Sequence, residues 1–223
     1  MPTEFPIKHS ETDLLTELER DALAELANIG VSRAAASLRK MVGQQVLLSV
    51  PSVEVVDHKT AAAVMSEREG DDLIAVRQDF RGSFSGRALL IFPHSNSLVL
   101  VRAVVGDGVP HDDVQAMEEE ALAETGNIIL NGCLATIANM LQLSLEMSLP
   151  SVLRGSGPQL LGIEGPKRGE GLVLFLYINF SIKDLDIRGY IAVLMDLPAL
   201  ANLKRLLAEF IERVISDDAR KVE

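Results

Sequence analysis

The stretch ELERDALAELANIGVSRAAASLRKMVGQQVLLSVPSV, residues 17–53, returns in altered form as MEEEALAETGNIILNGCLATIANMLQLSLEMSLPSV, residues 117–152. The two stretches align without a gap at an offset of 99 residues, the distance from Asp21 to Glu120. The same offset pairs Glu25 with Glu124, Asn28 with Asn127, and Pro51 with Pro150. Self-similarity at a fixed offset over this length indicates an internal repeat.

The likeness continues more loosely toward the end of each half. LIAVRQDF, from Leu73, is similar to LVLFLYINF, from Leu172, and GRALLIF, from Gly86, is similar to GYIAVLM, from Gly189. Each half then ends in a helical pattern, SNSLVLVRAVVG in the first and DLPALANLKRLLAEFIERVI in the second. We therefore predict one domain over residues 1–223, made of repeat units 12–110 and 111–223.

The expected order in each unit is helix, strand, variable connection, two-stranded hairpin and helix. In the first helix an apolar stripe recurs at spacings of three and four, which predicts one buried face. Its members are Leu15, Leu18, Ala22, Leu26 and Ile29. The strands LLSVPSV and EMSLPSV each contain a proline, which predicts a sheet edge, a bulge or a strand end. Residues 154–171 are rich in glycine and are predicted to form a mobile loop.

Two such units would each be marginal if they folded separately, which favours a shared core. The predicted fold class is α+β, an internally duplicated fold. Two pseudo-symmetric helix-strand-hairpin-helix units share a mainly antiparallel sheet in this prediction.

Composition limits the classes of partner. Of the 223 residues 48% are hydrophobic, and the formal net charge is −11. A chain this acidic would repel a nucleic acid backbone. The charge suits a partner that presents lysine or arginine, although a soluble acidic surface is the commoner explanation.

Other features place the chain in a class of soluble proteins. The N-terminus lacks the apolar core of a signal peptide, and no stretch approaches the ~20 uninterrupted apolar residues that span a bilayer. We therefore expect a cytoplasmic protein without a membrane partner. Cys133 is the only cysteine, which excludes an internal disulfide, and its small apolar neighbours predict a buried structural thiol. The four histidines are scattered, so no metal site is expected.

Two sets of polar residues are the candidate functional sites. Positions i, i+4 and i+7 lie on one side of a helix, so Asp21, Glu25 and Asn28 share a face. Glu120, Glu124 and Asn127 share the corresponding face of the second unit. One such set alone would be explained by favourable interaction of acidic residues with a helix N-terminus. Two sets in register, each followed by a proline after the same interval, favour a function.

The pattern is an acidic residue, three residues, Glu, two residues, Asn, then twenty-two residues and Pro, as in Asp21 to Pro51. It resembles the signature of the CheC/CheX/FliY phosphatases. Both copies keep Glu and Asn, which is similar to CheC, whereas CheX is expected to keep one site and to dimerise. The resemblance therefore implies a monomer. The departures are Glu120, where Asp or Ser is usual, and Ala27, where Gly is common.

In that family the pattern serves to remove phosphate from an aspartyl-phosphorylated response regulator of the CheY type. The resemblance implies that Asn28 and Asn127 each orient a water for in-line attack, while Glu25 and Glu124 engage a lysine of the regulator. It places Asp21 and Glu120 in partner binding. Pro51 and Pro150 complete the motif as structural residues.

The chemistry agrees with this implied role. A carboxamide can both donate to and accept from a water, and phosphoryl transfer needs mainly positioning and charge stabilisation. The chain would need no cofactor of its own, because any Mg²⁺ would belong to the regulator.

Two alternatives stay open at this point. The chain could be an adaptor that binds and regulates the receptor deamidase CheD, which CheC proteins are known to partner. It could also be a structural part of the flagellar switch, which is disfavoured because nothing resembling the C-terminal switch domain of FliY follows the second unit.

Overall fold

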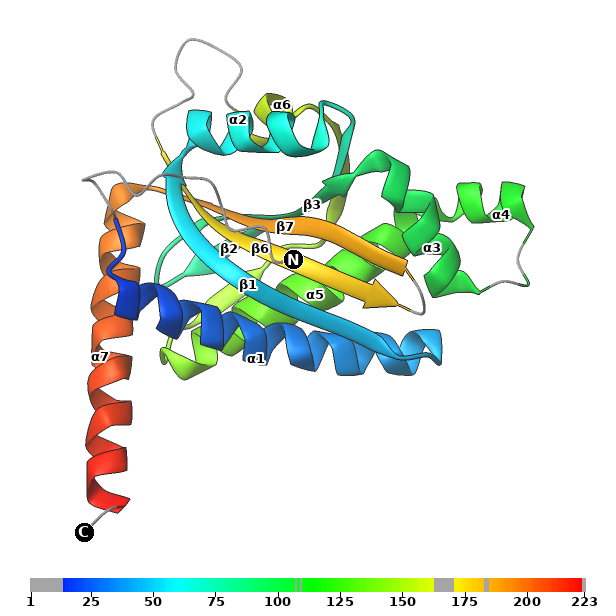
Figure 1. Ribbon diagram of the computed structural model, residues 1–223. Coiled ribbons are helices and arrows are strands. Elements are labelled where there is room, and N and C mark those ends of the chain that lie inside the picture. Colours follow the sequence, from blue (N-terminus) through cyan, green and yellow to red (C-terminus); the bar gives the residue numbers. More distant parts are fainter. Residues whose placement is uncertain (1–13, 107, 109, 163–170, 183–184, 222–223) are drawn as a thin grey trace.

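The structure is a computed structural model that describes residues 14–106, 108, 110–162, 171–182, 185–221 of the chain (Figure 1). The elements of the first half are α1 (Glu17–Val42), β1 (Val46–Asp57), α2 (His58–Glu69), β2 (Leu73–Gly82), β3 (Gly86–Pro93), the short 3₁₀ helix η1 (His94–Asn96) and α3 (Ser97–Val105). Those of the second half are α4 (His111–Ala116), α5 (Glu118–Met140), β4 (Leu145–Met147), β5 (Ser151–Gly155), α6 (Gly157–Leu161), β6 (Leu172–Ile182), β7 (Leu185–Met195) and α7 (Leu197–Lys221).

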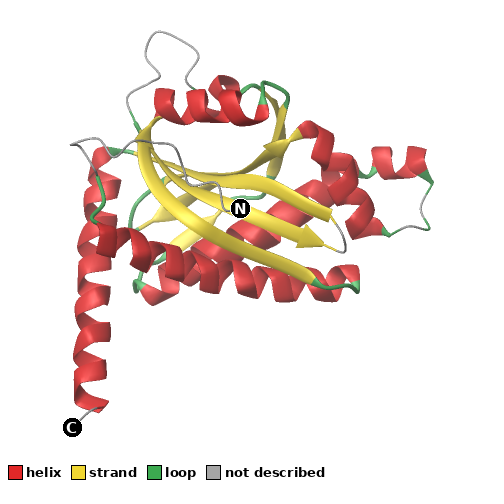
Figure 2. Ribbon diagram, viewed as in Figure 1, coloured by secondary structure: helices red, strands yellow, loops and turns green. Residues whose placement is uncertain are grey.

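All described strands form one antiparallel sheet (Figure 2). Its order is β1-β6-β7-β3-β2-β4, and β5 also pairs with β2. The predicted α+β class with a mainly antiparallel sheet is therefore confirmed.

The strands next to each motif proline pair with the hairpin of the other half. β1 runs along β6 from Val46↔Ile182 to Asp57↔Leu172, while β4 and β5 both run along β2. Read from either edge, the sheet presents a proline strand, then a hairpin, then the second hairpin and the second proline strand. This order supports the division into units 12–110 and 111–223, which remains our proposal.

The two long motif helices, α1 and α5, cover one face of the sheet (Figure 1). They cross at very close range, because a Cβ added to Gly30 would lie 2.7 Å from Cys133 Cα. A Cβ at Gly126 would meet the Val76 side chain at 2.5 Å, so α5 also lies tightly on β2. α5 is long and apolar enough to cross a membrane, but 61% of its most apolar window is buried in the protein, as expected for a core helix.

Helices α2 and α6 cover the opposite face and enclose a second, smaller core (Figure 1). Neither helix was predicted from the sequence. Asp57 begins α2, since its side chain accepts hydrogen bonds from the backbone of Lys59 and Thr60. α6 begins at a capping box between Ser156 and Gln159.

The prediction of a mobile loop over residues 154–171 is thus wrong at its start, where the chain completes β5 and forms α6. Residues 163–170 lie outside the described residues.

The predicted apolar face of α1 is only partly correct. Thr16 caps the helix through a capping box with Glu19, so Leu15 precedes the helix, where it is buried. Leu18 is 58% exposed and Leu26 is buried. The buried face comprises Leu23, Leu26, Ala27, Gly30, Val31, Ala34, Ala35 and Leu38. The stripe is rotated toward small residues because α5 packs against α1 as closely as the sheet does.

Candidate functional site

Both motif prolines lie where an outer ladder of the sheet has one extra residue, Pro51 within β1 and Pro150 between β4 and β5. In β1 the pairing jumps from Ser49↔Asn179 to Ser52↔Tyr177, so β1 has one more residue than β6 between these pairs. On the other side, Met147 pairs with Phe80 and Ser151 pairs with Arg77, which again leaves one extra residue on the proline strand. Proline cannot donate to a ladder, which explains why the pairing breaks there. The prediction of an edge, bulge or strand end is confirmed at Pro51 and Pro150.

At the first bulge Asn28 completes the hydrogen bonding of Val50. Its Oδ1 accepts from the Val50 backbone N–H at 2.8 Å, and its Nδ2 donates to the Val50 carbonyl at 2.9 Å. Nδ2 also donates to the carbonyl of Ala24 at 2.9 Å. Val50 is only 2% exposed, so these backbone groups need protein partners. Two of these three hydrogen bonds join α1 to β1, and both N–H groups of the Asn28 carboxamide are engaged.

At the second bulge Asn127 is held differently. Gln78 Nε2 donates to the Ser148 carbonyl at 2.9 Å and to Asn127 Oδ1 at 3.0 Å. Asn131 Nδ2 donates to the same Oδ1 at 2.7 Å. The Ser148 carbonyl can only accept, which fixes the nitrogen of Gln78 on that side and the oxygen of Asn127 toward it. Within the described part of the chain, Asn127 Nδ2 donates to no other residue, so its N–H groups are available to a partner.

The acidic residues of both motifs are exposed. Glu25 lies one turn before Asn28, and Glu124 lies one turn before Asn127. Asp21 on α1 and Glu120 on α5, one turn earlier still, are exposed too.

Glu118, at the start of α5, is not part of this exposed set. It is 5% exposed, accepts a hydrogen bond from Ser97 Oγ and forms an ion pair with Arg154. It anchors the first turn of α5 to α3 and β5, so the run Glu118 to Glu120 is more than a solvated helix start.

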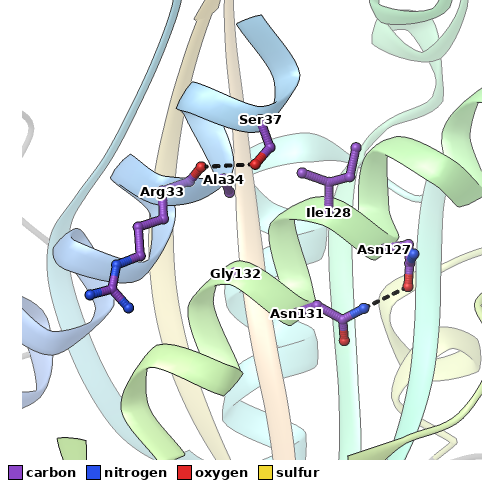
Figure 3. A pocket seen from close by; sticks show the side chains of 7 residues that line it. All are labelled: Arg33, Ala34, Ser37, Asn127, Ile128, Asn131 and Gly132. Carbon is purple, nitrogen blue, oxygen red and sulfur yellow. Dashed lines mark hydrogen bonds between the residues drawn. The ribbon is translucent and has the colours of Figure 1, made fainter. Parts of the chain in front are cut away.

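An open pocket of about 370 Å³ lies between α1 and α5, beside Asn127 (Figure 3). Figure 3 shows the oxygen of Asn127 turned toward Asn131 and its nitrogen turned away. Arg33 brings a positive charge to the α1 side of this pocket, and its Nη1 donates to Thr136 Oγ1 at 3.3 Å. The pocket is lined by Arg33, Ala34, Ser37, Asn127, Ile128, Asn131 and Gly132.

The two motifs do not form one composite site. Asn28 and Asn127 lie on different helices, each before the crossing at which Gly30 meets Gly132 and Cys133. Each motif is associated with its own bulge. This arrangement supports two separate candidate sites, which remain our proposal.

Gln78 is a site residue that the sequence analysis missed. The hairpins align best at an offset of 100, with Phe80 matching Phe180, so that Gln78 corresponds to Ile178 and not to Tyr177. Both are buried on the face that α1 and α5 cover. A polar residue in an otherwise apolar strand face, in line with Ile74 and Val76, was the available signal.

No group of three or more His, Cys, Asp or Glu residues that could hold a metal ion occurs among the residues that the structure describes. Cys133 is fully buried, and this burial raises the pKa of its thiol to about 12. The thiol is therefore protonated at neutral pH and is a structural group, as predicted.

The fold and the two motif helices define a class of proteins in which a shared antiparallel sheet carries two Glu–Asn helices on one face. The family model described as "Chemotaxis phosphatase CheX" matches residues 74–175, and the model of the "CheC-like family" matches residues 18–55. The resemblance to the CheC/CheX/FliY phosphatases that the motif spacing predicts is therefore confirmed.

Two curated relatives come from Bacillus subtilis. The flagellar motor switch phosphatase FliY is 26% identical over 144 residues, which is 64% of this chain and 37% of that protein. The CheY-P phosphatase CheC is 25% identical over 149 residues, which is 62% of this chain and 67% of that protein. The chain thus matches little more than a third of FliY and two thirds of CheC.

Among solved structures, FliY of Thermotoga maritima superposes with a TM-score of 0.68 at 17% identity. The match covers 88% of this chain and 98% of that one. At this level of identity the likeness establishes the fold.

Proposed function

We propose that this chain accelerates the loss of phosphate from an aspartyl-phosphorylated response regulator of the CheY type. The observation that carries the proposal is the geometry of Asn127, whose amide nitrogen is available beside an open pocket, one turn after the exposed Glu124. The relatives' names, CheY-P phosphatase and motor switch phosphatase, support the same reaction.

In this proposal Asn127 enters the phosphorylated pocket of the regulator and positions the water that attacks the phosphorus in line. Its N–H groups suit the electron-rich oxygens of a phosphoryl group or of that water. Glu124 engages a lysine of the regulator, and Glu120 adds to the binding surface. Phosphoryl transfer needs chiefly such positioning, so no nucleophile is required on this chain. Mg²⁺ is carried by the regulator.

Asn28, Glu25 and Asp21 are proposed for the same roles on α1. The hydrogen bonds to Val50 make the two sites unequal, because Asn28 must release them before its carboxamide can reach a partner. The nitrogen of the Asn127 side chain has no such hydrogen bonds to release within the described part of the chain.

The test is phosphate release from phosphorylated receiver domains with Asn28→Ala, Asn127→Ala and the double variant. Each single variant should keep the activity of the other site. The double variant should fall to the rate of the regulator alone, since losing a polar group that acts in the transition state costs on the order of 10²–10³ in rate. Asn139→Ala, an exposed asparagine at the far end of α5, is the matched control and should keep the parent rate.

Binding of the regulator, in contrast to the rate of phosphate release, should depend on the charge of the motif glutamates. Glu25→Lys combined with Glu124→Lys should abolish binding of the regulator by placing like charges together. The assignment of both helices would be wrong if the double Asn variant hydrolysed the phosphoregulator as fast as the parent.

The oligomeric state, the location in the cell and any partner other than the regulator are proposed from the family resemblance alone. We propose a cytoplasmic monomer, because duplication supplies the pairing that a one-site relative obtains by dimerising. Light scattering that detected a stable dimer at micromolar concentration would contradict this.

We also propose that the chain forms a complex with CheD of the same cell. A pull-down with both purified proteins tests this proposal, and failure to associate would contradict it.

A further inference from the structure

Gln78 and Ile178 occupy matching places in the two halves. Each lies on the hairpin strand that faces a proline bulge, Gln78 on β2 and Ile178 on β6. Gln78 is 1% exposed and Ile178 is 2% exposed, and both belong to the sheet face that the motif helices cover. One buried position beneath a motif asparagine is therefore an amide in one half and a hydrocarbon in the other.

This difference explains the two conformations of the motif asparagines. Ile178 has no donor, and Asn28 bonds instead to the backbone of Val50, which is buried. Gln78 supplies a donor, and Asn127 turns its oxygen inward to meet it. The residue that matches Val50 is Leu149, which is 90% exposed, so the second bulge is left free of its motif asparagine.

The amide of Gln78 lowers the stability of the fold. Its Oε1 is a buried acceptor with no hydrogen-bond partner in the described part of the chain. An unsatisfied buried acceptor is destabilising, and replacing a buried polar group by an apolar one of the same shape is often neutral or favourable. Ile178 demonstrates that the fold accepts a hydrocarbon at this position. The stability of the sheet therefore does not account for Gln78, whereas the orientation of Asn127 does.

We propose that Gln78 is a positioning residue that holds the carboxamide of Asn127 with its nitrogen toward the regulator. The inference rests on the proposed function and assigns Gln78 a part in the second site only. Gln78 does not touch the phosphoryl group. It acts through Asn127 Oδ1, together with the Asn131 donor on the helix surface.

The experiment converts the second site into the form of the first with Gln78→Ile. In the Asn28→Ala background, where only the second site remains, kcat for phosphate release should fall roughly 10- to 100-fold, as expected when a reacting group is misplaced by about an ångström. KM for the phosphoregulator should stay within about twofold, because Glu124 and Glu120 still bind it. In the Asn127→Ala background, Gln78→Ile should cause no further loss, since the two residues act as one unit.

Ile74→Val, on the same strand and face, is the control for a general disturbance of β2 and should leave kcat unchanged. Circular dichroism shows whether Gln78→Ile folds. If it does not, Gln78→Met is used in its place, because methionine has a volume similar to that of glutamine and an unbranched side chain. In the Asn28→Ala background, the folded Gln78 variant could keep the full kcat while Asn127→Ala lowers it. That result would overturn the role of Gln78 and leave the proposed function intact. An Asn127→Ala variant as fast as its background would instead contradict the proposed function at this helix.

Discussion

The backbones of Gly30 and Cys133 touch where α1 crosses α5. A Cβ at Gly30 would lie 2.7 Å from Cys133 Cα and 2.8 Å from the Gly132 carbonyl oxygen. These are backbone atoms, which cannot rotate away as a side chain can. The separation of the two helices, and with it the placement of both motif asparagines, is therefore set by the absence of a side chain at Gly30.

Gly30→Ala should destabilise the protein, although alanine favours a helix over glycine by about 1 kcal/mol. Overpacking costs about 1–3 kcal/mol, and we expect this cost to exceed the gain because the atoms that the new Cβ would meet belong to the backbone. Urea denaturation followed by circular dichroism measures the difference. Ser32→Ala, at an exposed position of the same helix, is the control and should change stability by less than about 0.5 kcal/mol. Equal stabilities of Gly30→Ala and the parent would disprove the close crossing.

Asn28→Ala should lower stability more than Asn127→Ala does. The first change leaves both backbone groups of the buried Val50 without partners, which costs about 2–4 kcal/mol. The second change leaves Gln78 Nε2 still bonded to the Ser148 carbonyl and costs about 1 kcal/mol. Denaturant midpoints of the two variants provide the comparison. A larger loss for Asn127→Ala would refute the different roles of the two carboxamides in the fold.

Cys133 should resist thiol reagents in the folded protein. Burial raises the pKa of its thiol to about 12, so the reactive thiolate is scarce near pH 8, and the side chain is 0% exposed. Alkylation by iodoacetamide, followed by mass spectrometry, should be slow in buffer and fast in guanidinium chloride. Rapid modification without denaturant would mean that the α1–α5 contact opens readily.

Asp79, next to the second bulge, should contribute a pH-dependent part of stability. Hydrogen bonds from Arg77 and then from Arg87 hold the pKa of the Asp79 carboxyl below its ordinary value, with the Arg77 Nη2 to Asp79 Oδ2 distance at 2.7 Å. A depressed folded-state pKa stabilises the protein above the ordinary pKa of about 4, and this contribution is lost as the pH falls through the depressed value.

The measurement compares urea denaturation of the parent and Asp79→Asn at pH 7 and near pH 3. At pH 7 the parent should be more stable by about 0.2–1 kcal/mol, the range of exposed ion pairs, because the Asp79 side chain is 45% exposed. The difference should shrink toward pH 3. A gap that stayed constant, or grew in acid, would argue against the ion pairs as its source.

The sequence predicted what depends on repetition and periodicity. The aligned halves predicted the two hairpins, the motif helices and an edge, bulge or strand end at Pro51 and Pro150, because proline cannot donate to a ladder. They did not predict that each outer strand pairs with the hairpin of the other half. The sequence did not reveal α2 and α6, whose caps at Asp57 and Ser156 lie in segments without an apolar period. Nor did it reveal Gln78. A polar residue on an apolar strand face was the one local signal, and the contact of Gln78 with Asn127, which joins β2 to α5, leaves no pattern in the sequence.

The exchange of strands between the halves has a consequence for how the chain reaches this structure. Val46 pairs with Ile182 and Arg77 with Ser151, so the outer ladders of the sheet join segments far apart along the chain. Such high contact order slows folding, because the entropy of closing long loops is lost before the contacts form. During synthesis β1 must wait, unpaired, until β6 has left the ribosome. We expect the unpaired strand to be prone to aggregation in that interval, and we expect the first half alone to be unstable as a fragment.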